Sequence, residues 1–221
     1  MGPAAKHLVT CLAPSPQLSQ VAISIPAFSA QTITVAYQTL PANTPRTNAN
    51  FVAVWESTMI PWTVAPLGTA KIPGDTQMGS VVIGNLSVQQ KPYIVGYAVG
   101  PNITDICASS VIYVGGQNGP TMSCSIGISS ITDDTIVVYY QCCNGYQPAK
   151  GKNWIGLWQG TVSPYYAPSP LASVTVTETA DEGYVPMNNL GLTIQTPYTL
   201  IYFLGPNMTE AAAILNFTTG S

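Results

Sequence analysis

The chain has 221 residues, a formal net charge of −3 and only 7% charged residues, whereas typical soluble domains have about 25%. Apolar residues make up 46% of the sequence, which is enough for a normal core and argues against disorder. The six Lys and Arg residues are spread along the chain, which excludes a basic patch for nucleic acid and argues against electrostatic docking on an anionic membrane. No apolar run of about 18 residues occurs, so no transmembrane segment is predicted.

Residues 1–16 are predicted to form a flexible N-terminal arm. They lack the charged and then apolar pattern of a secretory signal peptide. We therefore expect a cytoplasmic protein by default, or one exported without a recognisable signal peptide.

Short runs rich in Val, Ile, Thr and Tyr follow the arm, separated by Gly and Pro, and they predict strands throughout. The strands predicted in the first part of the chain cover residues 21–25, 32–40, 51–57, 79–83, 92–99 and 106–114. Those predicted in the second part cover residues 122–128, 135–143, 154–160, 183–187, 197–204 and 212–218.

The second set of strands repeats the first. Residues 50–55 (Asn-Phe-Val-Ala-Val-Trp) return as 153–158 (Asn-Trp-Ile-Gly-Leu-Trp), and residues 100–104 (Gly-Pro-Asn-Ile-Thr) return as 205–209 (Gly-Pro-Asn-Met-Thr). A repeat of this length is a whole domain. The sequence thus predicts an all-β chain of two tandem immunoglobulin-like antiparallel β-sandwiches, at 17–116 and 117–221.

Two tyrosines support a sandwich with Greek-key connections. Tyr93 and Tyr198 each follow a leucine and a short turn, and each opens an alternating strand. This pattern resembles the tyrosine corner, in which the phenol binds the backbone upstream. We therefore interpret both residues as structural.

The five cysteines are predicted to be reduced, buried thiols, because their number is odd and no secretion signal precedes them. A disulfide between the adjacent Cys142 and Cys143 is an alternative, but it would be strained in a strand. No metal site is predicted, since the single histidine, His7, lies in the arm.

Aromatic residues alternate with small ones on the strand face opposite the aliphatic positions. Phe51 and Trp55 flank an alanine, and Trp154 and Trp158 flank a glycine. Three interpretations are open for this outward apolar face: an interface between domains or subunits, including a homodimer; burial by the chain's own loops; or a ring platform for a sugar.

The loops after these strands carry aromatics as well. Trp62 in the first copy is matched by Tyr165 and Tyr166 in the second. Exposed rings beside Asn and Gln suit a neutral sugar, since rings pack on C–H groups and amides bind hydroxyls. Asn102 and Asn207, in the copied hairpin loops, are further ligand candidates, although turn chemistry explains them better.

The order Thr-Ile-Val-Val-Tyr-Tyr, Asn-Trp-Ile-Gly-Leu-Trp, Pro-Tyr-Thr-Leu-Ile-Tyr-Phe and Ala-Ala-Ile-Leu-Asn-Phe in the second copy resembles SKICH-type sandwich domains. It is also similar to the sandwiches that precede some metallophosphatase domains, and to the small haemagglutinins of slime moulds. The resemblance implies a fold and a role as adaptor, localisation module or lectin. No sugar-contacting residue is carried over from it.

The supply of catalytic groups is poor. With one histidine outside the repeat, no Ser–His or Cys–His pair can form within a copy. The acidic pairs at 133–134 and 181–182 are interpreted as solvated turns, with a weak calcium site as the alternative. We predict a non-catalytic, lectin-like protein that binds neutral glycans without a cofactor, with one potential site in each domain. The alternative is a structural or adhesion protein that pairs with other protein chains through its apolar sheet faces.

Overall fold

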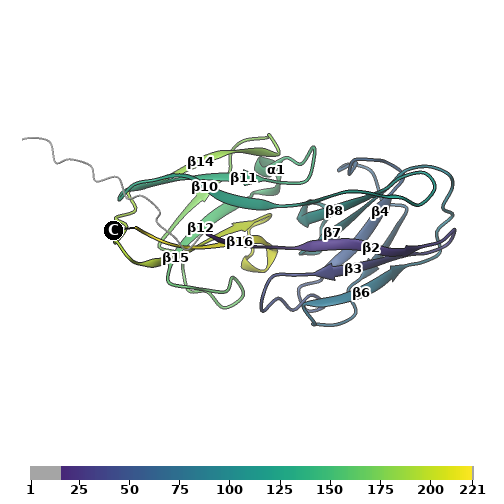
Figure 1. The fold of residues 1–221 in the computed structure, drawn as a ribbon, viewed down its shortest axis with the longest axis horizontal. Coiled ribbons are helices and arrows are strands. Elements are labelled where there is room, and N and C mark those ends of the chain that lie inside the picture. Colours follow the sequence, from purple (N-terminus) through teal and green to yellow (C-terminus); the bar gives the residue numbers. More distant parts are fainter. Residues whose placement is uncertain (1–15, 221) are drawn as a thin grey trace, which may run out of the picture.

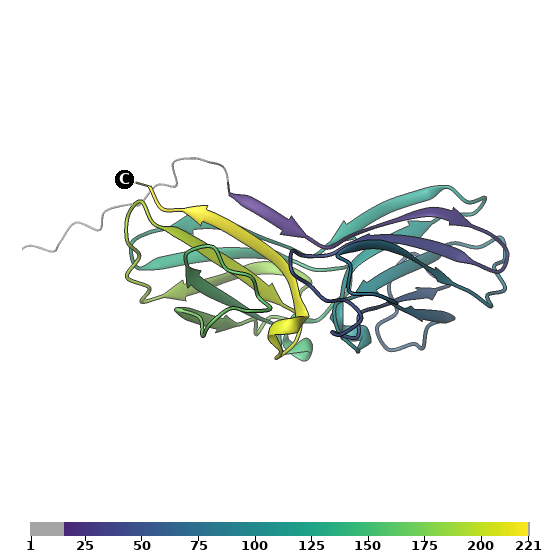
Figure 2. The ribbon, with the colours of Figure 1, turned by 90° about the horizontal axis from the view of Figure 1, so that it is seen from below.

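The computed structural model describes residues 16–220, which form two β-sandwiches placed end to end (Figures 1 and 2). Helical structure in this part of the chain is limited to three single turns, namely α1 (Pro148–Gly151), η1 (Ile103–Asp105) and η2 (Met208–Glu210). No helix among the described residues is long and apolar enough to span a membrane. The expected N-terminal arm lies almost entirely outside the described residues.

The first sandwich consists of a five-stranded sheet in the order β5-β4-β7-β8-β9 and a three-stranded sheet in the order β2-β3-β6. Every pairing in both sheets is antiparallel. The strands are β2 (Ala22–Phe28), β3 (Ile33–Gln38), β4 (Phe51–Trp55), β5 (Gly68–Lys71), β6 (Met78–Ile83), β7 (Tyr93–Ala98), β8 (Ile106–Ile112) and β9 (Asn118–Ser123).

The second sandwich has the same plan, with sheets in the orders β1-β16-β15-β12-β13 and β10-β11-β14. Its strands are β1 (Gln17–Gln20), β10 (Ser125–Ile131), β11 (Thr135–Gln141), β12 (Trp154–Gln159), β13 (Ala172–Thr175), β14 (Glu182–Asn188), β15 (Pro197–Phe203) and β16 (Ala211–Thr218). The predicted all-β fold of two immunoglobulin-like sandwiches is confirmed.

The two sandwiches exchange one strand each. β1 precedes the first sandwich in the chain but pairs with β16 of the second, and Figure 2 shows β1 beside β16. Conversely, β9 begins the second copy but pairs with β8 of the first sandwich. A single residue separates each exchanged strand from the next strand, Val21 in one copy and Cys124 in the other. The ranges 17–116 and 117–221 therefore describe the copied units, whereas the sheets cross the boundary at both ends.

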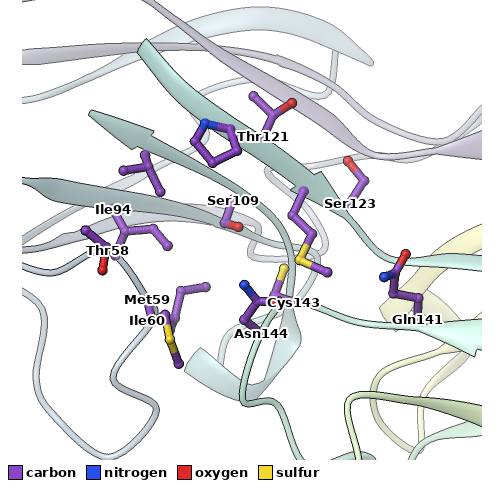
Figure 3. A pocket seen from close by; sticks show the side chains of 13 residues that line it. Thr58, Met59, Ile60, Ile94, Ser109, Thr121, Ser123, Gln141, Cys143 and Asn144 are labelled. Atoms are coloured by element: carbon purple, nitrogen blue, oxygen red, sulfur yellow. The ribbon is translucent and has the colours of Figure 1, made fainter. Parts of the chain in front are cut away.

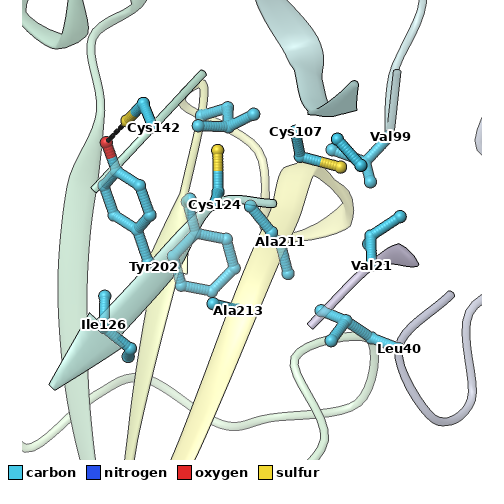
Figure 4. Packing of buried hydrophobic residues seen from close by; sticks show 14 of the residues in the cluster. Val21, Leu40, Val99, Cys107, Cys124, Ile126, Cys142, Tyr202, Ala211 and Ala213 are labelled. Carbon is cyan, nitrogen blue, oxygen red and sulfur yellow. Dashed lines mark hydrogen bonds between the residues drawn. The ribbon is translucent and has the colours of Figure 1, made fainter. Parts of the chain in front are cut away.

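A continuous apolar core joins the sandwiches. Figure 4 shows Val21, Val99 and Cys107 of the first copy beside Cys124 and Tyr202 of the second, and all five are buried. The hinge residues of the exchanged strands are themselves part of this cluster. Because an apolar interface of this kind resembles a domain core, we expect the two sandwiches to move as one body.

Local predictions hold well. The Tyr93 hydroxyl accepts a hydrogen bond from the backbone N–H of Gln89 at 2.8 Å, and Tyr198 accepts one from Thr193 at 3.0 Å, which confirms both tyrosine corners. The four described cysteines are free thiols and are buried, as predicted. Cys11 lies outside the described residues.

Candidate functional site

A pocket lies where the two sandwiches meet (Figure 3). Its volume is about 450 Å³, which is in the range of small-molecule sites. The first sandwich supplies the loop after β4 together with parts of β7, β8 and β9, while the second supplies the end of β11 and the loop that follows. We call it the junction pocket, and its walls are formed by Thr58, Met59, Ile60, Ile94, Ser109, Val111, Pro120, Thr121, Met122, Ser123, Gln141, Cys143 and Asn144.

The lining of the junction pocket carries no formal charge, since it contains no Asp, Glu, Lys, Arg or His. Hydroxyl and amide groups from Ser109, Gln141 and Asn144 line the pocket together with apolar side chains such as Ile94 and Met59. Hydroxyls and amides both donate and accept hydrogen bonds. This mixed lining suits an uncharged ligand that has both hydroxyl and C–H groups.

The pocket forms on the outer face of the β4-β7-β8-β9 sheet. Ile94 and Val111 are direct cross-strand partners there, next to a small apolar cluster that contains Trp55 and Ile60. The loop after β4 covers Trp55, and its Ile60 belongs to the same buried cluster as Ile94, which lines the pocket. Exchange of β9 into the sheet then provides the far wall of the pocket.

The aromatic sheet faces are covered by the chain itself, which was one of the three open interpretations. Trp55 is buried and its indole N–H donates to the carbonyl of Val64 in the next loop at 2.9 Å. Trp158 is also buried, and its indole N–H donates to the carbonyl of Pro168 at 2.8 Å. The rings of Trp55 and Trp158 are therefore not free to meet a subunit or a sugar.

Phe51 and Trp154, the other two aromatic residues of the predicted outward face, are half-buried. Phe51 packs against the apolar cluster of Trp55. Trp154 stacks on Phe203, with ring centroids 4.1 Å apart and planes at 9°, and its indole N–H donates to the carbonyl of Gly205. Both residues stabilise their own sandwich.

Two of the three loop aromatics bind the opposite sandwich. The indole N–H of Trp62 donates to the carbonyl of Asn144 at 3.1 Å, and its ring lies 4.9 Å from that of Tyr146. Tyr165 packs on the shared core, where burial and nearby Cys107 of β8 raise the pKa of its phenol. The prediction that Trp62 and Tyr165 present free rings is wrong, because both close the junction. Only Tyr166, at 78% exposure, is free to meet a ligand.

The copied hairpin loops use their asparagines for turn geometry. The backbone N–H of Asn102 donates to the Asp105 carboxylate at 2.7 Å, and the N–H of Asn207 donates to Glu210 at 2.8 Å. The side-chain amide of Asn207 also binds Glu210. The ligand role proposed for these two residues is therefore not supported, and the turn interpretation explains them.

The two hairpin loops meet at the junction and bring their carboxyl groups together. A Cβ atom added to Gly100 would lie 2.6 Å from Asp105 Oδ2 and 3.2 Å from Glu210 Cγ. Burial, followed by the charge of Glu210, raises the pKa of Asp105 to about 6, although the N–H of Asn102 opposes this. The contact between the two hairpin loops thus contains a carboxyl group whose pKa is raised toward neutral pH.

A second surface, which sequence reasoning missed, lies on the outer face of the β10-β11-β14 sheet. Tyr139 and Tyr184 are cross-strand partners there, with ring centroids 5.3 Å apart. The Tyr139 hydroxyl donates to Glu182 Oε2 at 3.0 Å, and partial burial together with this carboxylate raises the pKa of Tyr139. The outward parity of Tyr139 follows from the alternation that points Tyr140 inward, but its partner depends on the register between two distant strands.

The acidic pairs do not converge on a cation site. The pair at 133–134 precedes Thr135, which is the cross-strand partner of Asn188 at one end of the β11–β14 pairing. Glu182, of the pair at 181–182, is the partner of Gln141 at the other end. Asp181 accepts a hydrogen bond from the N–H of Gly145 instead. Among the described residues, no group of three His, Cys, Asp or Glu side chains has the arrangement of a metal site.

No protein-family model matches the sequence, and no curated protein matches it either. Among solved structures, the chain is similar to the BSP domain of a biofilm-associated protein (13% identity, 84% of this chain and 26% of that chain, TM-score 0.27). It is also similar to the FN1–FN3 domains of chicken CNTN1 (13% identity, 90% and 64%, TM-score 0.28) and to the human OSCAR ligand-binding domain (9% identity, 94% and 96%, TM-score 0.24). The chain spans about a quarter of the first of these and less than two thirds of the second.

Proposed function

We propose that this chain is a non-catalytic carbohydrate-binding protein that holds a neutral sugar in the junction pocket. The observation that carries the proposal is the lining of that pocket, which is uncharged and combines hydroxyl and amide groups with apolar surface. A sugar ring needs both, because its hydroxyls form hydrogen bonds and its C–H faces pack on apolar side chains.

The position of the pocket supports a single site rather than one site per copy. Its walls come from both sandwiches and from the exchanged strand β9. The exchange fixes these walls relative to one another, and a pre-organised site loses less entropy on binding. The resemblance of the second copy to SKICH-type domains and to slime-mould haemagglutinins is compatible with this role and remains an expectation.

A glycan array probed with the purified full chain tests the class of ligand, and calorimetry with the selected sugar then tests the site. Met122→Trp and Asn144→Trp each place an indole in the junction pocket, and both are expected to weaken binding at least about tenfold, or by about 1.4 kcal/mol. Ser19→Trp is the matched control, because Ser19 holds in β1 the place that Met122 holds in β9.

Circular dichroism must show that all three variants are folded. A blank array, or a selected sugar whose affinity is unchanged in both pocket variants, would reject the junction pocket as a sugar site. The structural and adhesion alternative would then take its place.

A further inference from the structure

The outer face of the β10-β11-β14 sheet carries chemistry that the junction pocket lacks. One row of cross-strand partners consists of Gly127, Tyr139 and Tyr184, and the row beside it consists of Ser125, Gln141 and Glu182. Directly opposed side chains in antiparallel strands lie on the same face of the sheet. Two phenol rings, an amide and a carboxylate therefore share one outward surface.

The two rings form an open angle rather than a packed stack. Their planes are inclined by 50°, and Tyr184 is 62% exposed. Together with Glu182 and the backbone of Gly183, they border an open hollow of about 500 Å³. At Gly127 an added Cβ would meet nothing within 4 Å, so no side chain blocks the approach to Tyr139 from that strand. We call Tyr139, Tyr184, Glu182 and Gly183 the tyrosine face.

The carboxylate of Glu182 has no cationic partner in the described chain. The ion pairs found there are Arg46–Asp75 and Lys91–Glu56, both in the first sandwich. The contact that Glu182 makes is with the neutral phenol of Tyr139. That phenol donates one hydrogen bond and leaves the other lone pairs of the carboxylate for a ligand.

The charge of the second copy favours a cation. Residues 117–221 contain six Asp and Glu and two Lys, whereas residues 17–116 contain three acidic and three basic residues. The negative charge of the chain is therefore concentrated in the second copy, which carries the tyrosine face. A field of this sign attracts cationic ligands over a distance of about 8 Å at physiological salt.

We propose that the tyrosine face binds a Lys or Arg side chain from a basic segment of a partner protein. The electron-rich faces of two tyrosines attract an ammonium or guanidinium group, and the Glu182 carboxylate completes the site with a charge-assisted hydrogen bond. The open shape of the hollow fits a side chain that projects from a larger partner. This site adjoins the proposed sugar site through Gln141, which lines the junction pocket, but Glu182, Tyr139 and Tyr184 do not line that pocket.

Fluorescence anisotropy with a short labelled peptide that alternates Lys and Gly tests the proposal, with a Glu–Gly peptide as the charge control. Tyr184→Leu removes the exposed ring and Glu182→Gln removes the charge; each is expected to weaken Lys-peptide binding roughly three- to tenfold. Tyr184→Phe keeps the ring face and is expected to remain within about twofold of the original affinity. Binding should also decrease as salt is raised.

A graft onto the first sandwich provides the opposite test. Ala36, Ser80 and Met78 occupy there the places of Tyr139, Tyr184 and Glu182. The triple variant Ala36→Tyr, Ser80→Tyr, Met78→Glu, made together with Tyr184→Leu, is expected to restore binding of the Lys peptide.

The proposal is overturned if the Glu peptide binds as well as the Lys peptide, or if Tyr184→Leu and Glu182→Gln leave the affinity unchanged. It is also overturned if the Lys peptide does not bind while Tyr184→Leu reduces binding of a sugar selected on the array. In that case the tyrosine face is part of a glycan site. If Met122→Trp reduces sugar binding and Tyr184→Leu does not, the result supports a sugar site in the junction pocket. That result does not contradict the proposal for the tyrosine face.

Discussion

In the first sandwich, Ile94 and Val111 line an open pocket on the outer face of the five-stranded sheet, whereas in the second sandwich the same places hold Thr199 and Asn216. The Thr199 hydroxyl lies 2.8 Å from Asn216 Oδ1 and also binds the carbonyl of Gly160 at 2.7 Å. These bonds draw the loop after β12 onto the sheet. A smaller hollow of about 180 Å³, lined by Asn216 and Thr161 among others, is left at this place in the second sandwich.

In the three-stranded sheets, it is the second sandwich that presents a pair of tyrosines on its outer face. The second sandwich exposes Tyr139 and Tyr184, while the first has Ala36 and Ser80 in their places. The buried positions of the two copies match closely, since their tyrosine corners, hairpin carboxylates and exchanged strands are all retained. Duplication has therefore preserved the core and allowed the exposed faces to diverge.

The strongest test of this comparison is to remove a matched tryptophan from each sandwich. Trp55 and Trp158 are both buried and both bind the following loop through the indole N–H. We expect Trp55→Ala and Trp158→Ala each to lower the free energy of unfolding by about 3–5 kcal/mol, because each leaves a cavity and breaks a loop contact. Urea unfolding followed by circular dichroism measures the loss.

The shape of these transitions is informative as well as their midpoint. Because the core is continuous and each sandwich completes a sheet of the other, both variants should unfold in one transition. Two separate transitions in either variant, with only the mutated sandwich shifted, would show that the sandwiches are independent. A surface control such as Ser19→Ala should leave the midpoint almost unchanged.

Local features of this fold could be predicted from sequence because they depend on neighbouring residues. The alternation in 135–141 correctly predicts that Ile136, Val138 and Tyr140 point inward. The tyrosine corners follow from a tyrosine and a turn a few residues away. In each case the periodicity of a strand or the chemistry of a turn determines the outcome.

The features that were missed depend on contacts between distant segments. Val21 and Cys124 look like ordinary strand residues, yet each marks the point where the chain passes from one sandwich to the other. The partner of an edge strand is chosen by packing and not by its own sequence, so the exchange carries no local signal. Trp62 was misjudged for the same reason, since nothing near it in sequence predicts its contact with Tyr146.

The carboxyl groups of the hairpin loops predict that the stability of the chain depends on pH. This effect is smaller than that of removing a tryptophan. The pKa of Asp105 is raised to about 6 in the folded chain, from an ordinary value of 3.8. The folded state therefore binds more protons than the unfolded state between these values, so its stability decreases as pH rises through this interval. Allowing for partial solvent screening, we expect a loss of about 1–2 kcal/mol between about pH 4 and pH 7.

Asp105→Asn provides the control for this effect, because an amide mimics the neutral carboxyl group in size. In this variant, stability should fall much less between about pH 4 and pH 7. The variant should also be more stable than the original chain at neutral pH. Urea unfolding at several pH values checks this. If the decrease persists unchanged in Asp105→Asn, another group is responsible for it.

The smallest predicted change in the free energy of unfolding concerns Trp62 and Tyr165, the two loop aromatics at the junction. We expect its sign to differ between the two residues. Tyr165 Oη is buried and has no hydrogen-bond partner among the described residues, whereas the indole N–H of Trp62 is bonded to Asn144. Tyr165→Phe should therefore stabilise the chain by about 1 kcal/mol, because it removes an unsatisfied polar group. Trp62→Phe should destabilise it by a similar amount, because the smaller ring loses contact with Tyr146. Thermal unfolding of the two variants measures both shifts, and shifts of the same sign would mean that the loops do not close the junction in the way their contacts indicate.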